Sequence, residues 1–347
     1  MFKKYKASYL FICLSLFCNV ALFSQSGFLD SSKINGPETT ITILYKYEQT
    51  YTMVNGKTFI YTKPRLLSFI TNLPHDAWGI ITTTFKKKSI KPLLLIGGTT
   101  LALMLADQPI SNGVRQFSKN IHFSSEEEYR NLLNIKLGKT DINLFKAPKN
   151  LNTALYQMGQ GFPSLLIGAG LFTYGKMHND YRALSTANQL VETFILMGVG
   201  TQFLKRISGR QSPSNATDDK GGEWQFFPSF KSYQTNTPNF DAFPSGHLAT
   251  LMSTVTILAE NYPEKKYIKP VGYSLIGLVG LSMINNNVHW ISDYPLAIGL
   301  GYLCARQVVK GNRKIVSSTS FKKNKPELSY TFNYINGRFI PGLIYKF

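Results

Sequence analysis

The stretch PSGHLATLMSTVTILA, from Pro244 to Ala259, carries the most information about the fold. Pro and Gly turn the chain where an apolar helix begins, so the backbone N–H groups of residues 245–247 point outward at a helix N-terminus. Such a terminus is a ready binding site for an anion. Taken alone, the motif is equally compatible with an ordinary turn and N-cap. The stretch therefore predicts a buried helix with a candidate anion site at its start.

A second polar cluster, HWISD at residues 289–293, follows the next apolar segment. His289 and Asp293 are spaced i, i+4, so on a helix the carboxylate can accept the imidazole N–H, fix the tautomer and raise the basicity of the other nitrogen. A histidine held in this way is a good nucleophile or base. The simpler alternative is a surface pair on a helix.

A basic run, KRISGRQSP at residues 205–213, closes an earlier apolar segment. It can supply positive charge for phosphate oxygens, although a basic helix end is usually just solvated. Because all three polar clusters adjoin apolar helices in this order, together they favour a phosphate site.

Six segments with few or no charges predict an all-α fold, a six-helix bundle. They are rich in Gly, Leu and Ile and hydrophobic on most sides, which is typical of a buried bundle or of membrane spans. Most are shorter than the ~20 residues that a span needs, so the relation to a membrane stays open. The segments are residues 92–106, 161–175, 191–204, 248–259, 271–288 and 294–305.

The two ends of the chain alternate like β-strands. Asn-Gly pairs at residues 55–56 and 336–337 predict short hairpins within 40–62 and 328–347. Residues 64–85 predict an amphipathic helix, and the polar stretch 107–150 an excursion over the bundle. The expected division is a signal peptide (1–25), an N-terminal hairpin and helix (26–90), the helical domain (91–310) and a tail (311–347).

Composition and the N-terminus narrow the class of partner. The chain has 38 Lys+Arg against 19 Asp+Glu, a net charge of +19, yet only 16% of its residues are charged. Residues 1–25 are typical of a secretory signal, with an uncleaved first membrane helix as the alternative. After cleavage Cys304 is the only cysteine, which excludes an internal disulfide. Export disfavours nucleic acid and favours anionic lipid or phosphate in a bacterial-type cell envelope.

The three clusters resemble the type 2 phosphatidic acid phosphatases, which share a six-helix bundle with vanadium haloperoxidases and bacterial acid phosphatases. Lys205 and Pro213 match the first motif, residues 244–247 match the second completely, and Ser282, His289 and Asp293 match the third. The resemblance covers roughly residues 92–310 and implies a six-helix bundle of this type.

The resemblance also implies a phosphatase mechanism that uses no metal or cofactor. His289 would attack phosphorus, Asp293 would hold its ring, and His247 would protonate the leaving alkoxide, with a phosphohistidine then hydrolysed by water. The transition-state oxygens would be stabilised by Lys205 and by the backbone N–H groups of Ser245 and Gly246.

Two positions depart from the family pattern, because Ser212 and Met283 stand where the family has arginine. Losing one such donor typically costs ~3 kcal/mol, about a hundredfold in rate. Arg210 is expected to swing in as a substitute, with Arg206 the weaker candidate. The thioether of Met283 suggests a pocket for a less charged or more lipid-like group.

Three functions compete on this basis. The first is an envelope phosphatase that acts on a lipid-linked phosphate or diphosphate at an anionic membrane surface, with its site on the periplasmic side. The second is a pseudoenzyme that binds a phosphorylated lipid without turnover. The third, a vanadate-dependent haloperoxidase, comes last because vanadate binding also relies on the two missing arginines.

Overall fold

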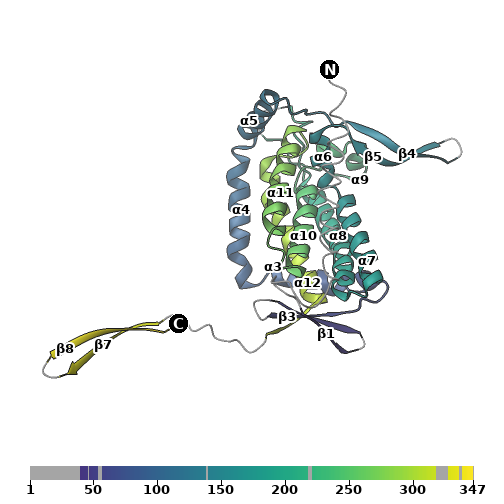
Figure 1. The fold of residues 1–347 in the computed structure, drawn as a ribbon. Helices are drawn as coiled ribbons and strands as arrows, with labels where there is room; N and C mark the ends of the chain where they lie inside the picture. Colours follow the sequence, from purple (N-terminus) through teal and green to yellow (C-terminus); the bar gives the residue numbers. More distant parts are fainter. Residues whose placement is uncertain are drawn as a thin grey trace, which may run out of the picture.

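Six long helices form the bundle of this computed structural model, which describes residues 40–45, 47–53, 57–137, 140–217, 221–317, 327–335 and 338–346. Each predicted apolar segment coincides with one of them, although the first was predicted to run two residues past the end of α4 and the fifth three residues past the end of α11. The predicted all-α bundle is confirmed (Figure 1). The helices are α4 (Ile90–Met104), α7 (Gly161–His178), α8 (Tyr181–Ser208), α10 (Gly246–Asn261), α11 (Ile268–Asn285) and α12 (Tyr294–Asn312).

Helix α10 lies at the centre of the bundle and packs against α7, α8, α11 and α12. Most of its side chains are buried, which explains why its sequence is apolar on nearly every side. Helix α12 approaches it closely at Gly301, where a Cβ atom would collide with the carbonyl of Ala249. This tight core holds the first turn of α10 in place, and the candidate site is built around that turn.

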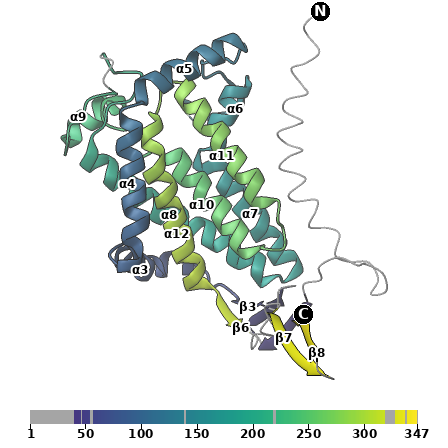
Figure 2. The ribbon, with the colours of Figure 1, turned by 90° about the vertical axis from the view of Figure 1, so that its left-hand side faces the viewer.

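Shorter helices cover the ends of the bundle. Helices α5 (Asp107–Asn120), α6 (Leu151–Met158) and α9 (Phe230–Thr235) lie at one end, and the N-terminal strands lie at the other (Figures 1 and 2). The single amphipathic helix predicted for residues 64–85 is wrong in detail, because α2 (Ser68–Thr71) and α3 (Leu73–Thr84) replace it. Two short 3-10 helices, η1 (Lys87–Ser89) and η2 (Thr237–Asn239), complete these connections.

Both predicted hairpins are present. Strands β2 (Glu48–Thr52) and β3 (Lys57–Thr62) pair antiparallel in the first, and β7 (Glu327–Ile335) and β8 (Arg338–Lys346) pair in the second. The first hairpin grows into a four-stranded sheet of order β1-β2-β3-β6, which also contains β1 (Thr40–Tyr45) and β6 (Lys314–Ser317). Strand β6 directly follows α12, so the sheet ties the N-terminal arm to the end of the bundle.

Residues 107–150, predicted as a polar excursion, are more ordered than expected. They contain α5 and a third antiparallel hairpin, formed by β4 (Tyr129–Leu137) and β5 (Thr140–Pro148). The predicted signal peptide, residues 1–25, lies outside the described residues and stays a prediction. Within the described part, α11 is apolar and long enough to cross a membrane. The bent pair Lys87–Met104 and Asp107–Asn120, which turns by 69°, would count as one more crossing.

Candidate active site

The Pro-Ser-Gly-His motif forms the N-terminus of α10, as the sequence predicts. Ser245 is the N-cap, and its side-chain oxygen accepts from the N–H of Leu248 at 3.5 Å. The N–H of Ser245 donates to the carbonyl oxygen of Asp293 at 3.2 Å, so it is already used and ties the second motif to the third. Within the described residues, the N–H groups of Gly246 and His247 have no backbone acceptor outside the helix. The anion site at this terminus therefore rests on Gly246 and His247, and the expected role of the Ser245 N–H is corrected.

His289 is held by two acceptors on its Nδ1 atom. This nitrogen lies 2.7 Å from the carbonyl oxygen of Ala242 and 3.4 Å from Oδ2 of Asp293. Because a carbonyl oxygen only accepts, Nδ1 is the protonated nitrogen of the neutral ring, and in that tautomer Nε2 carries the lone pair. The His289 side chain is buried, yet Nε2 is left as the basic atom. The ring is thus prepared as a nucleophile or base.

The pair His289 and Asp293 does not lie on one α-helix, contrary to the i, i+4 prediction. His289 lies outside any helix or strand, and Trp290, in extended backbone, separates it from the short 3-10 helix η3 (Ile291–Asp293). In this tight turn, Oδ2 of Asp293 accepts from the N–H of Trp290 at 2.8 Å, and its contact with the imidazole of His289 is longer, at 3.4 Å. The closer partner, the Ala242 carbonyl, comes from a different segment that the sequence pattern did not mark.

Arg210 contacts the carboxylate of Asp293 and does not point to the candidate anion site. Its Nη1 atom donates to Asp293 Oδ1 at 2.5 Å and to Ser292 Oγ at 2.6 Å. Its Nη2 atom donates to Asp107 Oδ2 at 2.6 Å and to the carbonyl oxygen of Gly221 at 2.8 Å. The expectation that Arg210 replaces a missing phosphate ligand is therefore wrong for this conformation. Arg210 instead neutralises two buried carboxylates.

Asp107 is a member of this network that sequence reasoning missed. It begins α5, and its Oδ1 atom accepts from the N–H of Ser292 at 3.0 Å. The carboxylate is fully buried, and burial raises its pKa against the opposing effects of Ser292 and Arg210. Nothing in the local pattern marked it, because it lies 103 residues before Arg210 and 185 residues before Ser292, in a stretch that reads as a polar loop.

Lys205 is buried at the end of α8, and an acidic residue holds its ammonium group. Its Nζ atom donates to Asp241 twice, to the backbone oxygen and to Oδ2, each at 2.7 Å. The other carboxylate oxygen of Asp241 accepts from the hydroxyl of Tyr233. Asp241 is three residues before Pro244, a position that could have marked it as part of the site. A phosphate group that uses Lys205 must share it with Asp241 or displace Asp241.

His247 faces His289 in the first turn of α10. The two ring centroids are 6.2 Å apart, and the ring of Tyr156 lies 4.4 Å from that of His247. Burial, followed by the electrostatic effects of the neighbouring His289 and Lys205, lowers the pKa of His247 to about 3. Its Nε2 atom is buried and has no partner among the described side chains and backbone groups. His247 is therefore neutral, and its Nε2 atom is an open hydrogen-bonding position.

The two positions without the family arginine are both occupied by buried side chains. Ser212 donates its N–H to the carbonyl oxygen of Pro238 at 2.8 Å. Met283 is fully buried in the main apolar cluster, and its sulfur accepts from Ser245 Oγ at 3.5 Å. The expectation that Met283 makes the pocket lipid-like is corrected, because its thioether packs beneath the N-cap rather than facing an opening. Ser282, the residue before Met283, donates to the backbone and side-chain oxygens of Asn152 and so ties α11 to α6.

The geometry brings the three sequence motifs together at one helix terminus. Residues 186–316 match the PAP2 superfamily. The predicted resemblance is confirmed over this segment, which contains Lys205, His247, His289 and Asp293. Asp107 and Tyr156 lie outside the PAP2 match, so part of the site is supplied by chain that precedes it.

Two solved structures show a weaker likeness. The Aquifex aeolicus protein LpxE is 20% identical, with a TM-score of 0.35 over 46% of this chain and 83% of that chain. The first transmembrane PAP2-type phosphatidylglycerolphosphate phosphatase from Bacillus subtilis is 17% identical, with a TM-score of 0.34 over 71% of this chain and 96% of that chain. No curated protein matches the chain.

Proposed function

We propose that this protein is a phosphatase that transfers a phosphoryl group from a lipid-type phosphomonoester or diphosphate to His289 and then to water. The observation that carries the proposal is the state of His289. Its Nδ1 proton is committed to Ala242 and Asp293, so the Nε2 lone pair is available, and the ring faces His247 beside the open N–H groups of α10. The match to the PAP2 superfamily supports the same chemistry.

In the first step, the Nε2 lone pair of His289 attacks phosphorus and the bond from phosphorus to the ester oxygen breaks. The leaving oxygen takes a proton from His247, which must first be protonated. Asp293 stabilises the positive charge that develops on the His289 ring. The equatorial oxygens would be held by the N–H groups of Gly246 and His247 and by Lys205.

In the second step, water attacks the phosphohistidine and the nitrogen–phosphorus bond breaks. Neutral His247 takes a proton from the attacking water, which returns His247 to the cationic form that the next cycle needs. Inorganic phosphate leaves, and His289 recovers its lone pair. Over the two steps, one ester and one water give one alcohol and one inorganic phosphate, and both histidines return to their starting protonation states.

A lipid-type substrate and a place at an envelope membrane form the second part of the proposal. Large apolar side chains are exposed along the bundle, among them Leu94 at 70% and Leu95 at 71% on α4, and Leu105 at 88% directly after it. Further exposed side chains, Val199 and Phe203, lie on α8. Such a surface favours contact with acyl chains, and the net charge of +19 favours an anionic leaflet. We propose that the site faces the outer side of that membrane.

The decisive experiment measures phosphate release by the purified protein from a panel of lipid phosphates and diphosphates and from a soluble aryl phosphate. We expect His289→Ala to abolish release from every member of the panel. His178→Ala is the matched control, because His178 lies at the end of α7, where it hydrogen-bonds to and stacks on Tyr174, and its removal should leave the rate unchanged. Wild-type release no greater than that of His289→Ala on all substrates would disprove the enzymatic proposal.

Binding without turnover is the second candidate, and one observation favours it. Lys205 is ion-paired to Asp241, and both arginine positions of the family pattern hold other residues. A site in this state could retain a phosphorylated lipid and fail to stabilise the transition state. The same assay separates the two candidates, because a binding protein would retain lipid phosphate, measured by co-sedimentation with vesicles, without releasing phosphate.

A further inference from the structure

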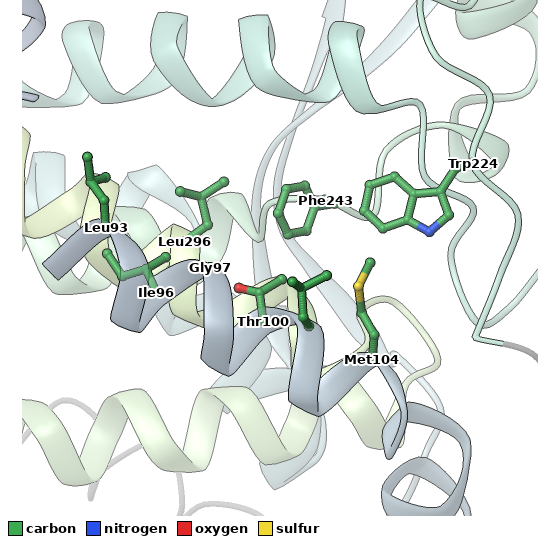
Figure 3. A pocket seen from close by; sticks show the side chains of 9 residues that line it. Leu93, Ile96, Gly97, Thr100, Met104, Trp224, Phe243 and Leu296 are labelled. Atoms are coloured by element: carbon green, nitrogen blue, oxygen red, sulfur yellow. The ribbon is translucent and has the colours of Figure 1, made fainter. Parts of the chain in front are cut away.

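An apolar groove runs along α4 on the side that faces the catalytic segments. Helix α4 contributes a stripe that includes Leu93, Gly97, Thr100 and Met104, and the groove has a volume of about 290 Å³ (Figure 3). From Leu93 to Met104 the helix rises over 104 − 93 = 11 residues, about 16 Å along its axis. The groove is thus long and apolar, and among its lining side chains only Thr100 and the indole N–H of Trp224 are polar.

The opposite wall comes from the segments that carry the candidate site. Phe243 immediately precedes Pro244, and Leu296 lies three residues after Asp293. The ring of Trp224 lies 5.3 Å from the ring of Phe243 and 4.9 Å from the guanidinium carbon of Arg210. The groove is therefore continuous with the backbone that holds His289 and the start of α10.

We propose that this groove holds the hydrocarbon chain of the phosphate ester whose phosphorus His289 attacks. The proposal rests on the proposed function and adds the place where the apolar part of the substrate binds. A chain seated along α4 would end beside Phe243 and Trp224, where the ester oxygen could reach the site. Leu93 and Leu101 are 41% and 66% exposed, so the groove is open along its side and the chain can enter laterally from a bilayer.

The lining also argues against a peptide in this position. A peptide strand would bring one N–H and one C=O per residue, and burying such a polar group without a partner is unfavourable. The walls offer few polar groups to receive them: the Oγ1 atom of Thr100, which has no partner among the described residues, and the Trp224 indole. A hydrocarbon chain has no such requirement, and each methylene that it buries favours binding.

Two adjacent glycines provide a matched test. Gly97 lines the groove and Gly98 does not, and a Cβ atom on either would meet no atom within 4 Å. Gly97→Phe therefore fills the groove without a clash at its own backbone, and Gly98→Phe adds the same side chain elsewhere on α4. We expect Gly97→Phe to lower kcat/KM at least tenfold for a long-chain alkyl phosphate and to leave hydrolysis of a soluble aryl phosphate unchanged. Gly98→Phe should change neither rate.

A binding experiment keeps this proposal separate from the proposed function. A long-chain alkyl phosphonate with a diazirine at the end of its chain is photolysed with the His289→Ala protein, and the labelled peptide is mapped. Labelling of residues 93–104 that is lost in the additional Gly97→Phe variant supports the groove even if the wild type releases no phosphate. Labelling of another segment, or of a second copy of this chain, overturns the groove proposal. In the kinetic experiment, it is overturned if the wild type is active and Gly97→Phe keeps the same preference for long-chain over short-chain phosphates.

Discussion

Arg210 Nη1 and Asp293 Oδ1 lie 2.5 Å apart, and both side chains are almost completely buried. The same guanidinium contacts Asp107 at 2.6 Å, so one cation neutralises two carboxylates behind the candidate nucleophile. This arrangement makes Arg210 a positioning residue, because it acts on His289 through Asp293 and not on the phosphate.

Two substitutions of Arg210 separate its contribution to stability from its effect on the position of His289. Arg210→Met should lower the free energy of unfolding by about 3–5 kcal/mol, because two buried carboxylates lose their partner. Arg210→Lys should be more stable than Arg210→Met, because it keeps a positive charge. It should still lower kcat with KM nearly unchanged, since a single ammonium group cannot bridge both carboxylates. Urea denaturation and steady-state kinetics measure the two effects. Arg206→Met, which removes a guanidinium that stacks on Tyr233 at 3.5 Å, is the control. A rise in KM with kcat retained would return Arg210 to the phosphate-binding role.

The protonation state of His247 should respond to phosphate. In the free protein its pKa is lowered to about 3, so the ring is neutral at pH 7 and cannot donate a proton. A bound phosphate dianion favours the imidazolium form, so added inorganic phosphate should move the titration of His247 toward the ordinary value of 6.5. NMR titration of the ring protons with and without phosphate measures this, and His247→Asn assigns the resonance. An unchanged titration would contradict the role of His247 as general acid.

Asp241 should weaken phosphate binding by holding Lys205. Asp241→Asn removes the competing charge, and we expect roughly fivefold tighter binding of inorganic phosphate, equivalent to about 1 kcal/mol for a partly exposed pair. Isothermal titration calorimetry measures the affinity. Tyr233→Phe is the control, because it removes the other partner of Asp241 and leaves the carboxylate on Lys205. Weaker binding in Asp241→Asn would show that Asp241 positions Lys205 for the ligand.

Restoring the family arginine at residue 283 should fail. Met283 is fully buried in the apolar cluster, so Met283→Arg places an unpaired charge in the core and should lower the free energy of unfolding by several kcal/mol. Met283→Leu keeps the volume and should cost less than about 1.5 kcal/mol. Chemical denaturation compares the two variants. A stable Met283→Arg protein with faster phosphate release would show that the core can open toward the site.

A buried acid far from the site should make stability depend on pH. Burial and the neighbouring Asp76 raise the pKa of Glu192 from 4.5 to about 9. The folded protein therefore holds a proton that the unfolded chain releases above pH 4.5, and stability should fall as pH rises toward 9, by up to about 1.4 kcal/mol per pH unit. Glu192→Gln should remove most of this slope in urea denaturation at pH 6 and pH 9. An equal slope in the variant would assign it to other groups.

Local patterns in the sequence were sufficient to predict the elements of the bundle. The six apolar segments, the two Asn-Gly hairpins and the helix start at Pro244 depend on periodicity and turn chemistry, which act over a few residues. The start of α2 at Ser68 was missed because Leu67, directly before it, adopts a left-handed φ of 69°, which an apolar residue rarely signals. The break between α2 and α3 lies at Asn72, where a proline stands in the first turn of α3.

The sequence by itself also determined which residues meet at the candidate site, since Lys205, His247, His289 and Asp293 all lie around the start of α10. Only the tertiary structure decided their partners. Ala242 and Asp241 come from a loop, Asp107 from another helix, and Arg210 turns away from the anion site because two buried carboxylates outcompete water for its charge. Such contacts join segments up to 185 residues apart and depend on burial, which no local spacing encodes.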